Sequence, residues 1–319
     1  MELSLPIHWA ILLSAIYVGF NIGANDAANC IGGCVGGGAL PFRRAVVLGA
    51  ASALAGGLLG GRVSETISSR ILSTAQFEPS LAVTVLVVSG ILVTVSTIAG
   101  IPVSTSNTIV MALVGVGLAL GIRIHSANLG LIVLSWSILP FVMIGLSNTI
   151  LRGLMILLRR VGSLVRLEII FKYMLIGSAA YASFALGASH SGLVGGMLQG
   201  TRIAGPFAAT VIGSISIAAG ILLMSGRVIR TVGSGITDLS PTSAFGMQVS
   251  SAVGLTVCSA IGLPVSSSQA IVSSAVGIGL SRRGAGVNKK QLEKIVAFWI
   301  LVPSAAMILA FVSALMLIT

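Results

Sequence analysis

Ten apolar segments separated by short polar connections run through this chain of 319 residues and constrain its fold more than any other feature. Several of them approach or exceed the roughly 18 uncharged residues that mark a transmembrane helix. Only 8% of the residues are charged, and the mean hydropathy is +1.08. A soluble domain could not bury so much apolar sequence, because a large share of any folded surface stays in contact with water. The sequence therefore predicts an all-α polytopic membrane protein. The segments are expected near 6–38, 44–61, 80–99, 103–121, 127–150, 171–200, 205–224, 243–261, 264–281 and 292–318.

The basic residues are distributed unevenly over the connections between these segments. The odd-numbered connections hold fourteen Lys and Arg residues, and the even-numbered ones hold four, namely Arg62, Arg70, Arg123 and Arg202. Connections rich in Lys and Arg stay in the cytoplasm. We therefore expect a multi-pass protein of the cell (plasma) membrane with both termini outside. Topology and contact with anionic lipids of the bilayer then explain the net charge of +11, and no nucleic-acid partner is expected.

Two hydroxyl-rich segments repeat each other 162 residues apart. Residues 100–118 read GIPVSTSNTIVMALVGVGL and residues 262–280 read GLPVSSSQAIVSSAVGIGL, with eleven of nineteen positions identical. Weaker matches relate 61–71 to 226–236 at an offset of 165, and 23–26 to 187–190 at an offset of 164. Three matches in the same order at nearly the same offset indicate a duplicated unit.

The number of segments sets the orientation of the two copies. Each half holds five apolar segments, so the second half enters the membrane from the opposite side. We predict one integral membrane domain made of two inverted-topology repeats, 1–160 and 161–319. Broken helices or re-entrant hairpins near the midplane are usual in secondary transporters of this build. The Gly-x-Pro-Val-Ser-x-Ser segments are candidates for hairpin tips. The long segment 6–38 is expected to tilt strongly, or to bend or break at 23–26, and the same holds for its counterpart around 187–192.

Asp26 is the only acidic residue expected inside the membrane. An ionisable group there is costly and indicates a functional site by default. Within the predicted spans, Arg and Lys occur only at the ends, so the partner of Asp26 must be His190, a bound cation or a proton. The alternative is a protonated Asp26 that caps a broken helix. His190 could exchange a proton or donate a hydrogen bond to an anion, or it could simply be satisfied by a neighbouring carbonyl.

Two clusters of hydroxyl and amide side chains follow Pro102 and Pro264. Proline favours the first turn of a helix, where unpaired N–H groups and the positive end of the helix dipole are exposed. Such a helix start can bind an oxyanion. Ordinary capping and close helix packing are the alternative, but the repetition favours a binding site. The candidate anion-binding residues are Asn25, Ser104, Thr105, Ser106, Asn107, Ser189, His190, Ser266, Ser267, Ser268 and Gln269.

The charges of the site constrain the mechanism. A divalent oxyanion beside Asp26 would be strongly repelled at low dielectric, so a cation must bind first or the site must be protonated. Sodium or proton symport of an oxyanion is therefore expected, with no cofactor besides the coupling Na⁺ or H⁺. A cation transporter or exchanger that uses Asp26 is the rival hypothesis. An enzyme is disfavoured, because Asp26 and His190 offer no obvious nucleophile–base set and no metal-ligand cluster.

Residues 23–29, GANDAAN, resemble the signature of the inorganic phosphate transporter (PiT) family, whose members carry a GAND-type motif in each half. The Gly-x-Pro-Val-Ser-x-Ser segments look like the second repeated motif of that family. The resemblance covers nearly the whole chain and implies a sodium- or proton-coupled phosphate symporter with inverted repeats. It also implies that Asp26 holds the cation (Na⁺ if sodium-coupled), that Asn25 helps to bridge cation and anion, and that the Ser/Thr clusters hold the phosphate oxygens.

The chain departs from the family pattern in its second half. The second motif reads Gly187-Ala188-Ser189-His190, so one expected cation ligand is missing, and the long central cytoplasmic loop of larger relatives is absent. Some sulfate permeases resemble the same family, and loss of a carboxylate could suit sulfate, which at neutral pH has no proton to donate to an acid. Asp26 remains, so phosphate is expected ahead of sulfate. The oligomeric state stays open, with a homo-oligomer among the alternatives.

Overall fold

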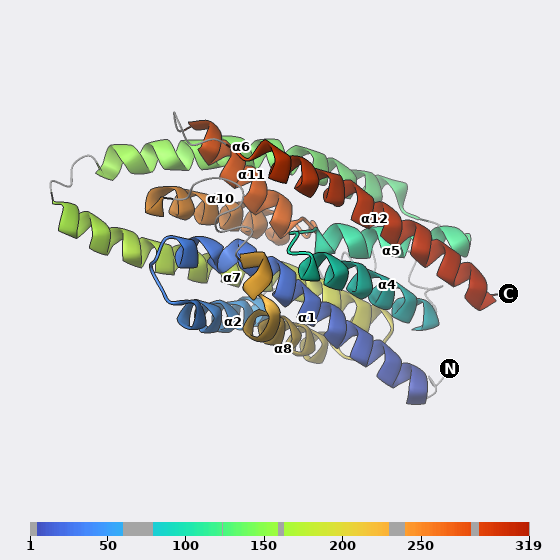
Figure 1. Cartoon of the computed structure of the whole chain (residues 1–319). Coiled ribbons are helices and arrows are strands. Elements are labelled where there is room, and N and C mark those ends of the chain that lie inside the picture. The colour runs from blue at the N-terminus through green and yellow to red at the C-terminus, as the bar shows by residue number, and fades with distance from the viewer. Residues whose placement is uncertain are drawn as a thin grey trace.

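The structure is a computed structural model that describes residues 5–59, 79–122, 124–158, 163–229, 240–281 and 287–318. All elements in these ranges are helices (Figure 1). They are α1 (Leu5–Gly36), α2 (Phe42–Leu59), α4 (Pro79–Ile98), α5 (Thr105–Ala119), α6 (Ser126–Leu158), α7 (Leu164–Gly200), α8 (Pro206–Met224), α10 (Pro241–Ala260), α11 (Ser267–Ser281) and α12 (Lys289–Ile318). Each corresponds to one predicted segment. The largest difference is around 151–170, where α6 and α7 extend into the expected connection.

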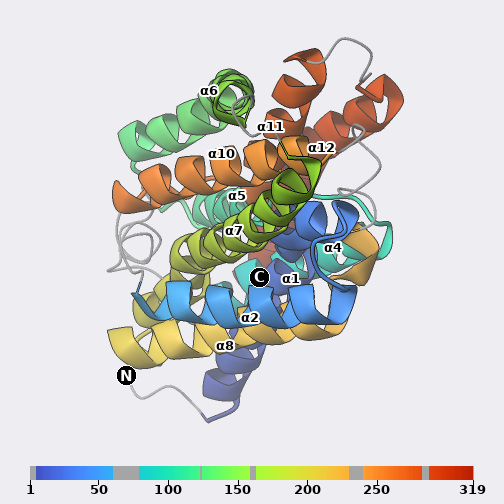
Figure 2. The same cartoon turned by 90° about the vertical axis from the view of Figure 1, so that its left-hand side faces the viewer.

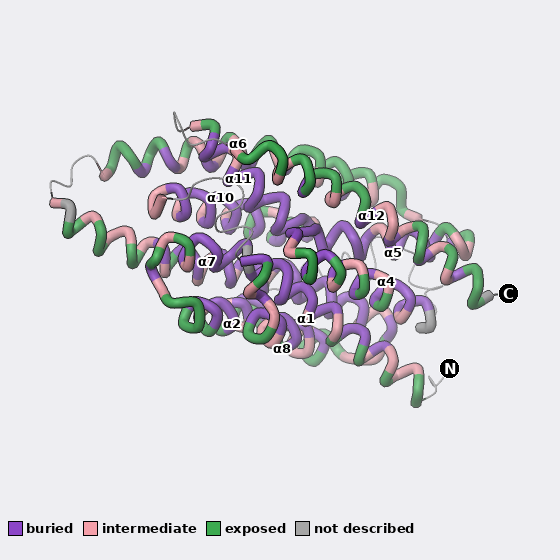
Figure 3. The backbone as a smooth tube through the Cα atoms, viewed as in Figure 1, coloured by how far each residue is buried: buried purple, intermediate pink, exposed green. Residues whose placement is uncertain are grey.

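Seven of the described helices are long and apolar enough to cross a membrane, namely α1, α2, α4, α6, α7, α8 and α12. Large apolar side chains face outward along α6 and α12, which form one outer layer of the bundle (Figure 3). Phe141 on α6, for example, is 76% exposed. Helices satisfy their own backbone hydrogen bonds and can therefore present such surfaces to lipid. The predicted all-α polytopic membrane architecture is confirmed.

Of the alternatives expected for the long segments that form α1 and α7, which were a strong tilt, a bend or a break, the break at the polar motifs is wrong. Both helices are continuous through 23–26 and 187–190. Gly23 is needed there for close packing, because a Cβ atom on it would lie 2.0 Å from the carbonyl oxygen of Ile217 on α8. A Cβ on Gly187 would likewise lie 1.9 Å from the carbonyl oxygen of Ala53 on α2. The glycines thus let the helices touch rather than interrupt them.

Two helical hairpins contain the repeated hydroxyl-rich segments. α4 and α5 lie toward one end of the molecule, α10 and α11 lie toward the other, and their tips are 99–104 and 261–266 (Figure 1). Each tip turns at a glycine with positive φ, 71° at Gly100 and 77° at Gly262, a conformation that favours glycine. The tips meet in the interior, where the Ser268 hydroxyl donates to the carbonyl of Val103 at 2.8 Å.

The packing of the helices repeats between the two halves. α1 packs on α8 as α7 packs on α2, and α5 packs on α12 as α11 packs on α6. Figure 2 shows α2 and α8 side by side, with α6 at the opposite side of the bundle. α1 begins at the end where both termini lie, whereas α7 begins at the other end (Figure 1). These features support the inverted relation of 1–160 and 161–319, which stays a prediction. The match between 61–71 and 226–236 falls largely outside the described residues.

Candidate functional site

Asp26 lies on α1 at the point where the two hairpin tips meet, and its side chain is fully buried. One hydroxyl from each hairpin lies within hydrogen-bond distance of its carboxylate. Thr105 Oγ1 on α5 lies 2.7 Å from Asp26 Oδ2, and Ser268 Oγ on α11 lies 3.1 Å from Oδ1, so the single Ser268 proton is shared between Oδ1 and the nearer carbonyl of Val103. The two clusters that the repeat placed 162 residues apart in sequence therefore converge on a single carboxylate.

His190 on α7 faces the same carboxylate from the second half of the chain. Its Nε2 lies 3.7 Å from Asp26 Oδ2, and both side chains are fully buried. Ser106 Oγ lies 3.3 Å from the same nitrogen and donates its proton to the carbonyl of Val265 at 3.1 Å. The Ser106 oxygen is then left to accept a hydrogen bond from the imidazole. Of the partners that the sequence allowed for Asp26, the structure brings His190 into contact distance.

Asn25 holds the first hairpin tip against α1. Its Nδ2 donates to Thr97 Oγ1 at 2.9 Å and to the carbonyl of Ile101 at 3.3 Å. Its Oδ1 accepts from the backbone N–H of Val103 at 3.1 Å. The side chain thus supplies hydrogen-bond partners for backbone groups of the extended tip. These groups have no partner within a helix or strand. This positioning role is additional to the bridging role that the family resemblance implied.

Asn29 is a residue of the site to which the sequence reasoning gave no role. Its Nδ2 lies 3.4 Å from Asp26 Oδ1 and 3.4 and 3.2 Å from the hydroxyls of Ser267 and Ser268. Its Oδ1 is buried and has no hydrogen-bond partner among the described residues. The available signal was its place in the motif, because residues three apart on a helix share a face.

Ser104 and Ser266 occupy equivalent positions and cap their own helices. Ser104 Oγ accepts from the backbone N–H of Asn107 at 3.1 Å, and Ser266 Oγ accepts from that of Gln269 at 3.0 Å. This is the capping alternative considered for the clusters, and it turns these two hydroxyls toward their own helix starts. A direct contact of either one with an anion stays a prediction.

The remaining predicted residues are Ser189, Asn107 and Gln269. All three are buried, and they adjoin His190 or the two hydroxyl clusters in the sequence. Ser189 precedes His190 on α7 and is 2% exposed. Asn107 Oδ1 and Gln269 Oε1, at matching positions of α5 and α11, are buried and have no hydrogen-bond partner among the described residues. Such amide oxygens, like the oxygens around Asp26, are ligands that hard cations accept.

The chemistry of the centre is that of reversible ion binding. A carboxylate and several hydroxyl and amide oxygens suit Na⁺ or a proton, while the same hydroxyls can donate to an oxyanion. The described residues contain no group of three or more His, Cys, Asp or Glu side chains that could hold a transition metal. The arrangement offers neutral dipoles around one acid and one imidazole, a set of groups suited to ion binding.

The comparisons with known proteins agree with this chemistry. The chain matches the family described as "Phosphate transporter family" over residues 22–310. It is 31% identical over 278 residues to a "Putative phosphate permease" of Methanocaldococcus jannaschii, covering 86% of each chain. It is 28% identical to the "Sulfate permease CysP" of Bacillus subtilis, over 95% of this chain and 86% of the relative. A solved structure titled "The sodium-dependent phosphate transporter" has the same fold, with a TM-score of 0.88 at 23% identity over 98% of this chain and 99% of that chain.

Fold and site together define a multi-pass helical membrane transporter rather than an enzyme. The chain belongs to the phosphate transporter family, as its match over residues 22–310 shows. The family resemblance that the GAND-type and Gly-x-Pro-Val-Ser-x-Ser motifs indicated is confirmed.

Proposed function

We propose that this protein imports inorganic phosphate across the plasma membrane, driven by the co-transport of Na⁺ or H⁺. The single observation that carries the proposal is the buried Asp26–His190 pair, enclosed by hydroxyls from both hairpin tips. A buried charge pair that serves only stability could be replaced by apolar residues at little cost. Its place between two converging polar tips fits a site that ions enter and leave.

Asp26 is the cation or proton site in this mechanism. Two unit charges about 4 Å apart interact by about 4 kcal/mol at an effective dielectric constant of 20. A phosphate dianion beside an uncompensated carboxylate would meet repulsion of at least this order, and His190 alone supplies at most one positive charge. A Na⁺ ion or a proton on Asp26 removes the repulsion, so cation and anion bind best together. The solved structure of the same fold is titled as sodium-dependent, which supports Na⁺ as the coupling ion.

The phosphate oxygens would be held by hydroxyl and amide donors around this pair. Thr105, Ser106, Ser267 and Ser268 are buried beside Asp26 or His190, and Asn25 adjoins them on α1. Ser104, Ser266, Asn107, Gln269 and Ser189 complete the proposed binding set, the first two chiefly by capping the helix starts that face the anion. Neutral donors bind an anion without trapping it, which suits a carrier that must release its cargo.

The orientation in the membrane is part of the proposal. Fourteen of the Lys and Arg residues fall in odd-numbered connections, which supports a cytoplasmic location for these connections and an outside location for both termini. Both termini lie at one end of the molecule, as this topology requires (Figure 1).

Uptake of labelled phosphate into proteoliposomes tests the function. We expect accumulation only when an inward Na⁺ gradient or pH gradient is imposed, and the two gradients applied separately identify the coupling ion. Asp26→Asn, which keeps the shape but removes the charge, should reduce coupled uptake by at least about tenfold, because a charge-assisted hydrogen bond is worth about 1.5–3 kcal/mol. Sodium movement without any anion, or full uptake by Asp26→Asn, would contradict the mechanism.

Sulfate is the second candidate substrate, and His190 is the observation that favours it. Sulfate has no proton to share with an acid at neutral pH, and an imidazole in place of a second carboxylate is a donor that sulfate can use. The similarity to a sulfate permease over 95% of the chain points the same way. Uptake of the two anions measured side by side, and competition of each against the other, decides between them.

A further inference from the structure

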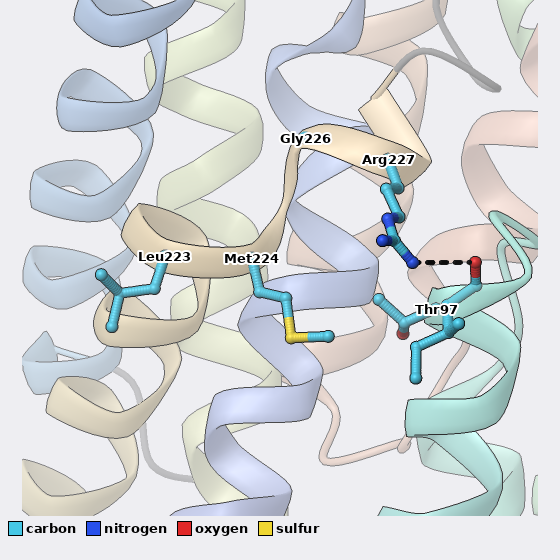
Figure 4. Close-up of a pocket in the computed structure, with 6 residues that line it drawn as sticks. Thr97, Leu223, Met224, Gly226 and Arg227 are labelled. Carbon is cyan, nitrogen blue, oxygen red and sulfur yellow. Dashed lines mark hydrogen bonds between the residues drawn. The ribbon is translucent and has the colours of Figure 1, made fainter.

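A cavity of about 410 Å³ lies between the end of α8 and the end of α4, outside the buried centre. Thr97 and Ile98 of α4 line one side, and Leu223, Met224, Gly226 and Arg227 line the other (Figure 4). Most of this lining is apolar, and Arg227 is its one charged residue. The cavity needs an explanation, because nothing in the binding of ions at Asp26 uses it.

The guanidinium of Arg227 is available to bind an anion. Figure 4 shows the side chain reaching toward Thr97, and its Nη1 donates to the carbonyl of Ile98 at 3.5 Å, a long hydrogen bond. A guanidinium carries five N–H donors, so this contact leaves most of them free. Within the described parts of the chain, Arg227 forms no ion pair with a carboxylate. Arginine is the side chain best suited to phosphate-like groups because its planar fork matches two oxygens at once.

Thr97 connects the cavity to the buried centre. Its side chain is 1% exposed, and its hydroxyl oxygen accepts a hydrogen bond from Asn25 Nδ2 at 2.9 Å. Asn25 is the neighbour of Asp26 in the chain. Thr97 therefore contacts both the cavity that Arg227 lines and the side chain next to Asp26 in the chain.

We propose that the Arg227 cavity is a separate binding site for a tetrahedral oxyanion, occupied before the anion enters the buried centre or after it leaves. Arg227 follows α8 in a connection whose basic residues predict a cytoplasmic location, so this site serves the cytoplasmic side. The proposal rests on the proposed function in taking inorganic phosphate as the anion, in its passage through the buried centre and in the orientation of the protein in the membrane. Arg227 has a counterpart in the first half, Arg62 of the repeated Gly-Arg-Val, which lies outside the described residues.

Transport kinetics test the site from the side that it serves. In inside-out vesicles, where the predicted cytoplasmic face meets the medium, Arg227→Gln should raise the apparent KM for phosphate about tenfold with a smaller change in kcat, and Arg227→Lys should raise it less. Arg166→Gln is the matched control, because Arg166 is exposed on α7 and takes no part in either site; its KM should not change. A lower melting temperature of Arg227→Gln with an unchanged KM would assign Arg227 to capping α4 and overturn the proposal.

Chemical labelling tests the same site without relying on the folding of an Arg227 variant. Met224→Cys, made together with Cys258→Ser, should react with a charged methanethiosulfonate reagent, and inorganic phosphate should slow that reaction several-fold. The Cys258→Ser protein with Met224 intact gives the background from Cys30 and Cys34, which are buried. Labelling that phosphate does not slow overturns the site.

The two proposals can fail separately. Asp26→Asn added to the labelled protein should abolish coupled uptake yet keep the protection by phosphate, because the cavity lies outside the buried pair. Protection without any coupled uptake in the parent protein would overturn the proposed symport and leave the cavity site standing. Coupled uptake without protection would overturn the cavity site alone.

Discussion

The two hairpin tips have nearly the same sequence but are fixed by different contacts. The first tip is clamped from α1 by Asn25, which contacts the backbone of Ile101 and Val103 with both ends of its amide. The same two apolar residues pack in a small cluster with Val93 and Val302. The first tip is therefore held by one amide, by a patch of apolar contacts and by the Ser268 hydroxyl of the opposite hairpin, which lies 2.8 Å from the carbonyl oxygen of Val103.

The second tip has no amide in the corresponding place. Ser189 replaces Asn25 in the motif on α7, and a hydroxyl is too short to span two backbone groups. Instead, the indole of Trp136 on α6 donates to the carbonyl of Pro264 at 3.0 Å, and Ser106 donates to that of Val265 at 3.1 Å. The second tip is thus held from the outer layer by Trp136, while its contact with Ser106 mirrors the contact between Ser268 and Val103 at the first tip.

This difference shows which parts of a duplicated scaffold are free to diverge. The glycines at the helix contacts occur in both halves. The contact of Gly23 with Ile217 and that of Gly187 with Ala53 involve residues related by the same offset of 164. The polar residues next to them differ, with Asp26 in one half and His190 in the other. A nearly symmetric arrangement of helices therefore encloses a site with one acid and one imidazole. We expect this difference between the halves to affect the coupling of cation and anion transport.

Restoring the acid in the second half should give the largest effect. His190→Asp would place two carboxylates about as far apart as the present pair, and their repulsion, on the order of 4 kcal/mol, can be relieved by binding a cation. We expect the half-saturating Na⁺ concentration for phosphate uptake to fall by up to about a thousandfold and the uptake to require one more Na⁺ per cycle. A sodium titration of uptake together with a flux ratio measures both.

His190→Asn is the matched control for this change, since it removes the imidazole without adding an acid. It should leave the number of Na⁺ ions per cycle as in the parent protein. If His190→Asp and His190→Asn behave alike in the sodium titration, position 190 does not contribute to cation coupling and the asymmetry has another role.

The corresponding pair Asn25 and Ser189 should differ strongly in stability. Asn25→Ala leaves the carbonyl of Ile101 and the N–H of Val103 buried without a partner, at about 1–3 kcal/mol for each group. Ser189→Ala should cost well under that sum, because a small buried hydroxyl is replaced by a group of similar size. Thermal unfolding in detergent compares them, and equal losses of melting temperature would contradict the view that only the first tip is clamped by an amide.

The sequence predicted the helices well because each apolar run can be recognised from its own residues, without knowledge of the residues that pack against it. Each predicted segment has its helix, and the hairpin tips were recognised from the proline and glycine of the repeated motif. A break at 23–26 and 187–192, one of the three alternatives expected there, does not occur, for a physical reason. A glycine lowers helix propensity, but the same residue lets two backbones touch, and only the fold reveals that Ile217 and Ala53 lie opposite.

The site could be predicted only as a set of residues. Asp26, Thr105 and Ser268 were found as polar groups in apolar sequence, and the structure brings Thr105 and Ser268 within hydrogen-bond distance of Asp26. Their assignment to cation or anion depends on bound ions and stays a prediction. The Arg227 cavity could not be predicted from the sequence. An arginine near a helix end indicates only the membrane orientation, and the sequence does not show that α4 lies beside it.

The smallest expected effect separates the two tryptophans near the hairpins. Trp136 Nε1 donates to Pro264, whereas the buried Nε1 of Trp299 on α12 has no hydrogen-bond partner among the described residues. Trp136→Phe should lower the stability by about 1 kcal/mol, because the Pro264 carbonyl loses its donor. Trp299→Phe removes an N–H that is already unsatisfied and should be neutral or slightly stabilising. Melting temperatures measured in the same detergent should differ by about 2–4 °C, and a Trp299→Phe protein that is the less stable of the two would show that the second tip does not depend on α6.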